Sequence, residues 1–311
     1  MPLKLVTFAP FIRKSMRIIS LFTIIVSIYF ITACSGGKQL TQNKAQAEKA
    51  FQSGNYQEAL ALYESVIASF ESSDDAINCP VYARASEAAS QVGQTEKAIR
   101  FLEADRYTRF ANADTWFDLS LLYREIDNIS KEIEALEEYL KRYPEADKAD
   151  QARTRLFDIY METRNWEYAN SQWNVIPDAS RESRIEDCFV FNRALKNDHA
   201  CDTLAIQLLK NDGENKVALE WMAKKLFWKA EKLYQKEMKA YNENRTNKQY
   251  RQLLNALDVV TADFKISLDY FKKLYDTDPQ PEYAKYLGDI YNRLDDEKKA
   301  EYYYSKASGN N

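Results

Sequence analysis

The stretch YLGDIYNRLDDEKKAEYYYSKA, residues 286–307, decides the fold. Its apolar side chains recur every three or four residues on either side of two aspartates, which is the spacing of a buried helix face. Gly288 and Ala300 are small, as two closely crossing helices require. Tyr291 and Tyr304 are large enough to fill the space toward a neighbouring pair of helices. The stretch therefore predicts a hairpin of two antiparallel helices.

The same pattern recurs along the chain. Each copy opens with a pair of residues that permit a turn and continues as an amphipathic helix. The copies are GNYQEALALYESVI (54–67), GQTEKAIRFLEAD (93–105), DNISKEIEALEEY (127–139), RNWEYANSQWNVI (164–176) and DDEKKAEYYYSKA (295–307). The first four begin 39, 34 and 37 residues apart. A period of this length with two helices per unit predicts a repeat architecture.

These units resemble the tetratricopeptide repeat (TPR) family. The residues that carry the resemblance are Trp116, Leu119, Tyr123 and Pro144 in one unit and Leu287, Gly288, Tyr291, Ala300, Tyr304 and Ala307 in the last. The resemblance implies an all-α, TPR-like α-solenoid of antiparallel helix pairs. It covers most of the chain after residue 40 and weakens between Ser183 and Asp276.

Where the resemblance is weak, between Ser183 and Asp276, the sequence predicts a departure from the repeat. Residues 183–213 look like a degenerate helical pair, broken at Asn197-Asp198. After a stop at Asn211-Asp212-Gly213, about 30 residues follow without a helix breaker, and a second long helix is expected from about Lys248 to Tyr275. The sequence thus predicts one elongated helical hairpin, whose aromatic stripe is interpreted as packing rather than as a ligand site.

The N-terminal residues read as a targeting segment. Residues 1–33 contain four basic residues and no acid, and the run Ile18–Ile31 is apolar over 14 residues. A membrane-spanning helix needs about 20, so the run predicts a signal peptide. Ile31-Thr32-Ala33-Cys34 resembles the bacterial lipobox, which implies cleavage before Cys34 and acylation of that cysteine, for example with palmitate. The alternative is a cysteine that merely ends a signal anchor.

The expected organisation follows the chain in order. It comprises a lipoprotein signal peptide (1–33), the acylated Cys34 with a tether (34–40), four TPR-like units (41–182), the degenerate pair (183–213), the long hairpin (214–278) and a C-terminal TPR-like unit (279–311). No acidic residue follows Cys34 before Glu48, which resembles lipoproteins of the outer membrane. We therefore expect a lipid-anchored protein that faces the periplasm.

Composition and motifs argue against several function classes. The net charge of −4 argues against a nucleic-acid partner. The chain has one histidine and lacks the phosphate-binding, zinc-hydrolase and serine-hydrolase motifs. We expect no catalytic residues, metal or cofactor. Cys79, Cys188 and Cys201 fit neither a CxxC motif nor a zinc site and are expected to be small buried residues.

The TPR resemblance places function on the concave face, which the first helix of each unit lines. In register, that face would carry Lys44, Glu48, Phe51, Glu87, Gln91, Phe117, Leu121, Arg124, Asp158, Met161, Lys285, Asp289 and Asn292. The family's clamp for C-terminal carboxylates uses Lys, Asn and Arg on this face. The corresponding column of this chain is acidic and consists of Glu48, Glu87, Asp158 and Asp289. This departure indicates a basic or mixed partner, unless the acids only keep the groove soluble.

Three functions remain open. The first hypothesis is a membrane-tethered, non-catalytic protein-binding scaffold or assembly factor of the bacterial cell envelope. The second is a glycan-binding lipoprotein, which would require tryptophans exposed as a flat array. The third is an enzyme, which would require a deep pocket with two or more buried carboxylates.

Overall fold

The computed structural model describes residues 39–309, and these residues form helices and turns without a β-strand. They divide into two compact units, with the boundary between Arg153 and Thr154. The first unit contains a helix over residues 39–52, then α2 (Tyr56–Glu71), η1 (Ala76–Asn78), α3 (Tyr82–Gln91), α4 (Thr95–Asp105), α5 (Ala113–Glu125) and α6 (Ile129–Arg142). Helix α7 (Ala149–Glu162) begins in this unit and continues into the second. The all-α prediction is confirmed for the described residues.

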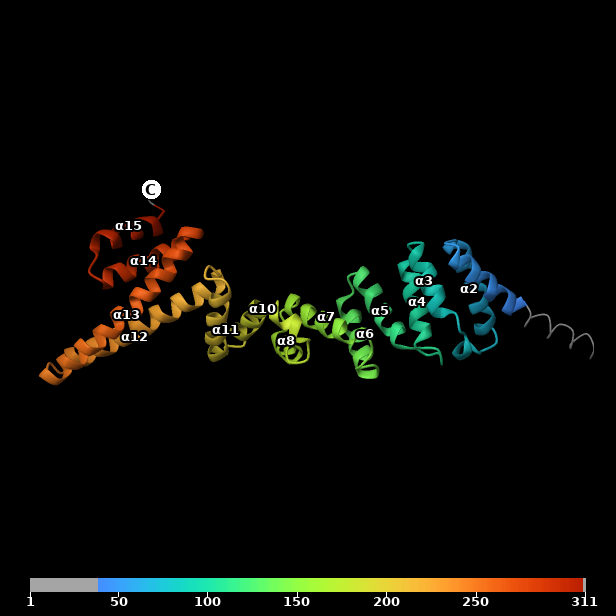
Figure 1. The fold of residues 1–311 in the computed structure, drawn as a ribbon, viewed down its shortest axis with the longest axis horizontal. Coiled ribbons are helices and arrows are strands. Elements are labelled where there is room, and N and C mark those ends of the chain that lie inside the picture. The colour runs from blue at the N-terminus through green and yellow to red at the C-terminus, as the bar shows by residue number, and fades with distance from the viewer. Residues whose placement is uncertain (1–38, 310–311) are drawn as a thin grey trace, which may run out of the picture. The chain divides into compact units, whose positions relative to one another are not determined.

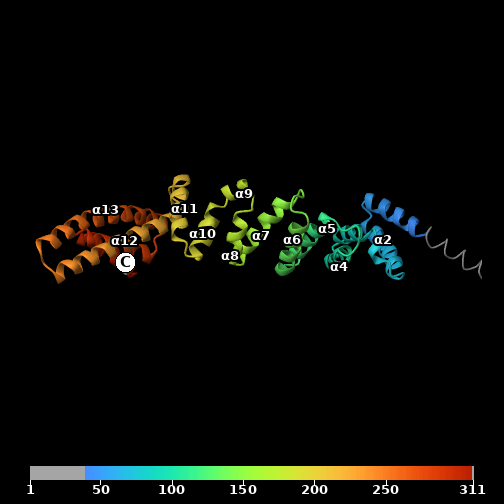
Figure 2. The same ribbon diagram turned by 90° about the horizontal axis from the view of Figure 1, so that it is seen from below.

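The second unit contains the long hairpin. Its elements after α7 are α8 (Trp166–Trp173), α9 (Asp178–Glu182), α10 (Ile185–Ala194), α11 (Asp198–Asn211), α12 (Lys216–Glu243), α13 (Asn247–Thr277), α14 (Pro281–Arg293) and α15 (Glu297–Ala307). Helices α12 and α13 contain 28 and 31 residues and lie side by side (Figures 1 and 2). The predicted elongated hairpin is therefore present. Its tip extends beyond α14 and α15, which pack nearer its base (Figure 1).

Six helix pairs are closed by one kind of turn. One residue in each turn has a positive φ, between 53° and 77°, and these residues are Gly54, Gly93, Asp127, Arg164, Lys196 and Asp295. The next residue donates its backbone N–H to the carbonyl five positions back, over 2.8 to 3.0 Å, as between Asn128 and Tyr123. This is the Schellman closure of a helix C-terminus. It satisfies backbone groups that a helix end leaves without partners.

The turn at Lys196 lies beside Asn197-Asp198, where the sequence predicted a break between the two helices of the 183–213 pair. Asn197 N–H donates to Asn192 O over 2.9 Å, as in the other turns, and the Asn197 side chain caps α11 at Ala200 N–H. The pair α10 and α11 is therefore a regular helical hairpin. The predicted tether also ends earlier than expected, because residue 39 is already helical. Cys34 and the predicted signal peptide lie outside the described residues.

Successive helices of the first unit pack against one another, as repeat packing requires. Tyr63, Tyr82 and Leu119 are fully or almost fully buried in its core. Asp105, at the end of α4, is also buried and accepts a hydrogen bond of 2.7 Å from Thr115 Oγ1 on α5. Burial raises the pKa of Asp105, while the hydrogen bonds from Thr115 and Thr108 oppose that rise.

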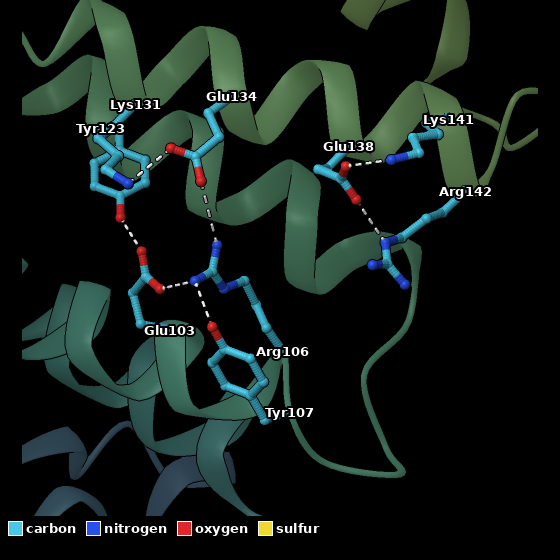
Figure 3. Close-up of polar contacts among 9 residues, drawn as sticks. All are labelled: Glu103, Arg106, Tyr107, Tyr123, Lys131, Glu134, Glu138, Lys141 and Arg142. Carbon is cyan, nitrogen blue, oxygen red and sulfur yellow. Dashed lines mark hydrogen bonds and ion pairs between the residues drawn. The ribbon is translucent and has the colours of Figure 1, made fainter.

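A charged network joins α4, α5 and α6 (Figure 3). Arg106 forms ion pairs with Glu103 and with Glu134, the latter over 3.8 Å. The Arg106 and Arg142 guanidinium carbons lie 5.2 and 4.9 Å from the ring centroid of Trp116. Trp116 is therefore held by two cation–π contacts within the packing of the unit.

The last pair confirms the expected close crossing of its helices. A Cβ added at Gly288 would lie 2.7 Å from the Tyr304 ring atoms Cδ1 and Cε1. The two arms of the hairpin are joined by a buried hydrogen bond of 2.9 Å from Ser267 Oγ to Ala223 O. Phe271 stacks on Tyr286 with ring centroids 4.5 Å apart, which fixes α14 on the hairpin.

Candidate partner-binding surfaces

The first unit has a groove of about 680 Å³ between α3 and α5, which we call the α3–α5 groove. Two residues predicted for the concave face, Glu87 and Leu121, line it. Leu121 is 38% exposed, whereas Leu102 and Leu122 are buried behind it. The groove thus has an apolar floor that a partner side chain can reach.

The rim of the α3–α5 groove contains ion pairs. Arg84 lies 2.8 Å from Glu87, and Lys148 lies 2.9 Å from Asp114 and 3.7 Å from Asp118. Burial raises the pKa of Asp118, although the nearby Lys148 ammonium opposes that rise. Both signs of charge are therefore presented around the apolar floor.

Arg84 is the main residue that the sequence-based site prediction missed. Its guanidinium carbon lies 5.1 Å from the ring centroid of Phe51, and its Nε lies 3.9 Å from Glu48. It therefore connects three residues predicted for the concave face: Glu48, Phe51 and Glu87. The i,i+3 spacing is a sequence signal for the ion pair between Arg84 and Glu87, but not for the contacts of Arg84 with Glu48 and Phe51. Lys44 and Gln91 are exposed but do not line the groove.

Two predicted residues of α5 have structural contacts instead. Phe117 is only 4% exposed, packs edge-on against Tyr139 and lies under the Lys148 ammonium. The prediction that Phe117 lies on the binding surface is therefore wrong, because its ring is part of the packing between α5 and α6. Arg124 Nε lies 2.8 Å from the buried Glu132 and compensates its charge.

In the second unit, Asp158 lies 3.1 Å from Arg184, and Met161 is half-buried. Asp289 accepts a hydrogen bond of 2.9 Å from Tyr304. Together with the contacts of Arg84 to Glu48 and Glu87, each acid of the predicted acidic column has a partner within its own unit. Arg84 and Arg184 therefore offset part of the charge of three of these acids, and Tyr304 fixes the position of the fourth, Asp289.

Three predicted residues of the last pair lie together. Lys285, Asp289 and Asn292 line a groove of about 400 Å³ between α12 and α14, beside Trp228. On the same wall, Arg293 donates to both carboxylate oxygens of Glu231 over 2.9 and 2.6 Å. This pair lowers the pKa of Glu231 and holds α14 to the hairpin. A second groove of about 580 Å³ lies on the α11 side of α12 and shares Trp228.

The tryptophans do not form a flat exposed array. Trp116 is buried, Trp166, Trp173 and Trp221 are half-buried, and Trp228 is 49% exposed. This arrangement lacks the platform that a glycan-binding protein of the expected kind would need. The carboxylates that line the three grooves are exposed or, like Asp118, only partly buried.

Within residues 39–309, no group of His, Cys, Asp or Glu has the arrangement of a metal site. Cys79, Cys188 and Cys201 are free and buried, as expected. Burial raises the pKa of Cys188 to about 11. No helix in this described part of the chain has the length and apolar character needed to cross a bilayer.

No protein-family description matches the sequence, and no curated relative does. Solved structures that resemble the chain include a tetratricopeptide repeat protein from Parabacteroides merdae, at 12% identity and a TM-score of 0.41, with 88% of this chain and 93% of that chain covered. The C-terminal part of a TPR repeat-containing protein from Cytophaga hutchinsonii is 13% identical, with a TM-score of 0.42 and coverages of 86% and 94%. A TPR repeats protein from Bacteroides fragilis is 14% identical, with a TM-score of 0.36 and coverages of 81% and 98%.

Proposed function

We propose that this chain is a non-catalytic protein-binding scaffold or assembly factor of the bacterial cell envelope. The observation that carries the proposal is the α3–α5 groove, with its apolar floor and charged rim. An apolar centre surrounded by polar groups is the usual anatomy of a surface that binds a polypeptide. Helices closed by repeated turns hold the walls of such a groove in place before the partner arrives, which lowers the entropic cost of binding.

The rim favours a partner of mixed charge. Arg84 and Lys148 already neutralise Glu87, Asp114 and Asp118 in part, so a strongly basic partner would have to displace these ion pairs. A segment with one apolar side chain, flanked by polar groups of both signs, matches the groove without that cost.

The membrane tether is part of the proposal and rests on the sequence. The lipobox-like Ile31-Thr32-Ala33-Cys34 supports acylation of Cys34, and the absence of an acid before Glu48 supports the outer membrane. A lipid at the start of the mature chain would place the grooves at the periplasmic face of that membrane.

The test captures partners from detergent-solubilised membranes with the full-length protein and identifies them by mass spectrometry. Leu121→Glu places a charge on the groove floor and is expected to reduce partner recovery at least tenfold. Ile129→Glu is the matched control, because Ile129 is 42% exposed in the same unit and lies outside the groove. Equal recovery with both variants would contradict binding through this groove.

The tether is tested on the same preparations. The intact mass of the wild-type protein should correspond to a chain that starts at an acylated Cys34, and Cys34→Ala should release the protein from the membrane fraction. An uncleaved N-terminus would refute the lipoprotein part of the proposal and leave the groove test unaffected.

A further inference from the structure

The long hairpin has a charge opposite to that of the rest of the chain. Residues 216–277 contain 13 Lys and Arg against 8 Asp and Glu, a formal charge of +5, whereas the whole chain carries −4. The described part of the first unit, residues 39–153, contains 13 basic and 21 acidic residues, a charge of −8. Segregation on this scale creates a local positive potential on an acidic protein.

The positive charge of α12 lies along one line. Lys225, Lys229, Lys232, Lys236 and Lys239 are spaced by four, three, four and three residues and are all exposed. This spacing places them on one helix face, over a length of about 21 Å. We call this set the lysine stripe. The face lies opposite the buried face of α12, which contains Ala223, Phe227 and Ala230.

The ion pairs of the lysine stripe divide it into two parts. Near the base, Lys225 pairs with Asp202, and Lys229 lies 2.9 Å from the buried Asp263, so these two lysines support the fold. Farther along, Lys236 and Lys239 are each 76% exposed and reach Glu237 and Glu243 over 3.3 and 3.8 Å. Because the ammonium groups of both lysines are exposed, solvent screens these pairs, which hold the lysines only weakly. With Lys232, which has no ion pair among the described residues, they form an available cationic surface.

The base of the lysine stripe opens into the groove of about 580 Å³ that Trp221 and Trp228 line. Trp221 is fixed, because its Nε1 donates to Asp202 over 3.1 Å. Trp228 packs edge-on against the buried Phe227, with ring centroids 5.2 Å apart, and is 49% exposed. Trp228 thus presents an exposed aromatic surface at the base of the lysine stripe.

We propose that the lysine stripe and this groove bind an acidic segment of a partner protein, with one apolar side chain against Trp228 and carboxylates along the lysines. The proposal rests on the protein-binding function proposed above and names the chemistry of a second partner site. A groove of about 580 Å³ between helices accommodates the side chains of a polypeptide, which a flat bilayer surface lacks. The acidic remainder of the chain would repel extended polyanions such as nucleic acid.

The test measures binding of a fluorescein-labelled, Glu-rich dodecapeptide with one central Leu to the full-length protein in detergent micelles. The triple variant Lys232→Glu, Lys236→Glu and Lys239→Glu should weaken binding at least tenfold at low salt. Its matched control is Lys248→Glu, Arg251→Glu and Lys265→Glu on α13, which makes the same charge change at exposed positions of the same hairpin. The control should stay within about twofold of wild type, and circular dichroism verifies that both variants fold.

Further probes separate the alternatives. Replacing Glu by Gln in the peptide should abolish binding, and Trp228→Ala should weaken binding of the Leu peptide but not of its Ser counterpart. Equal losses in both triple variants would overturn the proposal, since they would indicate general attraction. Stripe-dependent binding of phosphatidylglycerol vesicles or of oligothymidylate, without peptide binding, would also overturn it.

The membrane capture separates this proposal from the function on which it rests. A partner recovered equally with wild type and the lysine-stripe variant, but lost with Leu121→Glu, would refute the stripe and retain the scaffold. Failure to recover any partner with the wild type would refute the scaffold function itself.

Discussion

The absence of a Cβ atom at Gly288 allows the last two helices to cross closely. Its Cα–H faces the Tyr304 ring, and an added methyl group would lie within 2.7 Å of two ring atoms. The ring cannot turn away without cost, because Tyr304 also donates to Asp289. The small residue therefore sets the distance between α14 and α15.

Gly288→Ala is expected to destabilise the second unit by about 1–3 kcal/mol, because overpacking forces helices or rings apart. Urea denaturation measures the change. Gly213→Ala is the control, since the nearest atom to its added Cβ would be 3.9 Å away, and its effect should stay within about 0.5 kcal/mol. Equal effects of the two substitutions would mean that the close crossing is not a constraint.

The buried Asp105 should make the stability of the first unit depend on pH. Burial raises its pKa in the folded state, so its contribution to stability is greatest below the unfolded pKa and is lost as pH rises through the folded pKa. Asp105→Asn does not titrate and keeps an oxygen for Thr115. As the pH rises from the ordinary aspartate value of 3.8 toward neutrality, the free energy of unfolding of Asp105→Asn, measured by urea denaturation, should therefore increase relative to that of wild type. A constant difference across that range would show that Asp105 has an ordinary pKa.

At the scale of elements, the six turns between paired helices show which turn residues the sequence reveals and which it does not. Gly54 and Gly93 are obvious turn residues, since glycine adopts positive φ without steric cost. Arg164 and Lys196 adopt φ 58° without being residue types that favour it, so the sequence contains no direct sign of their positive φ. The long hairpin was predictable because its helices lack breakers over many residues.

The candidate site was predictable only in part, for a related reason. Helical register placed Glu87, Leu121, Lys285, Asp289 and Asn292 on the grooves. Register does not tell which aromatic ring packs inward, as with Phe117, or which arginine from a neighbouring turn reaches across, as with Arg84. Those contacts depend on how tightly adjacent helices pack. The periodicity of apolar residues in the sequence does not reveal this.

Lys196→Gly should stabilise the α10–α11 pair by up to about 1 kcal/mol, because it removes the strain of a side chain at positive φ. Gln207→Gly, at an exposed position within α11, should destabilise by about 1 kcal/mol. Thermal unfolding of the two variants compares them directly. Destabilisation by both would show that the Lys196 turn is not strained.

At the scale of the whole molecule, the two compact units have separate cores. A chain built from pairs that contact their neighbours transmits a local defect only over a short range. A substitution in the core of one unit is therefore expected to leave the core of the other unit intact.

Leu287→Ala should accelerate amide hydrogen exchange in α12 to α15, since removing a fully buried leucine costs about 2–5 kcal/mol. Exchange in α3 to α5 should remain unchanged, and hydrogen-exchange mass spectrometry resolves both regions in one experiment. Equal acceleration in both units would indicate one cooperative structure.

The central claim is that the chain binds a protein through the α3–α5 groove, and site-specific photocrosslinking in living cells tests it most directly. A benzophenone amino acid at position 121 should yield a discrete crosslinked protein, whereas the same group at position 129 should not. A crosslink of equal yield from both positions, or none from position 121 in cells that express the protein, would contradict the claim.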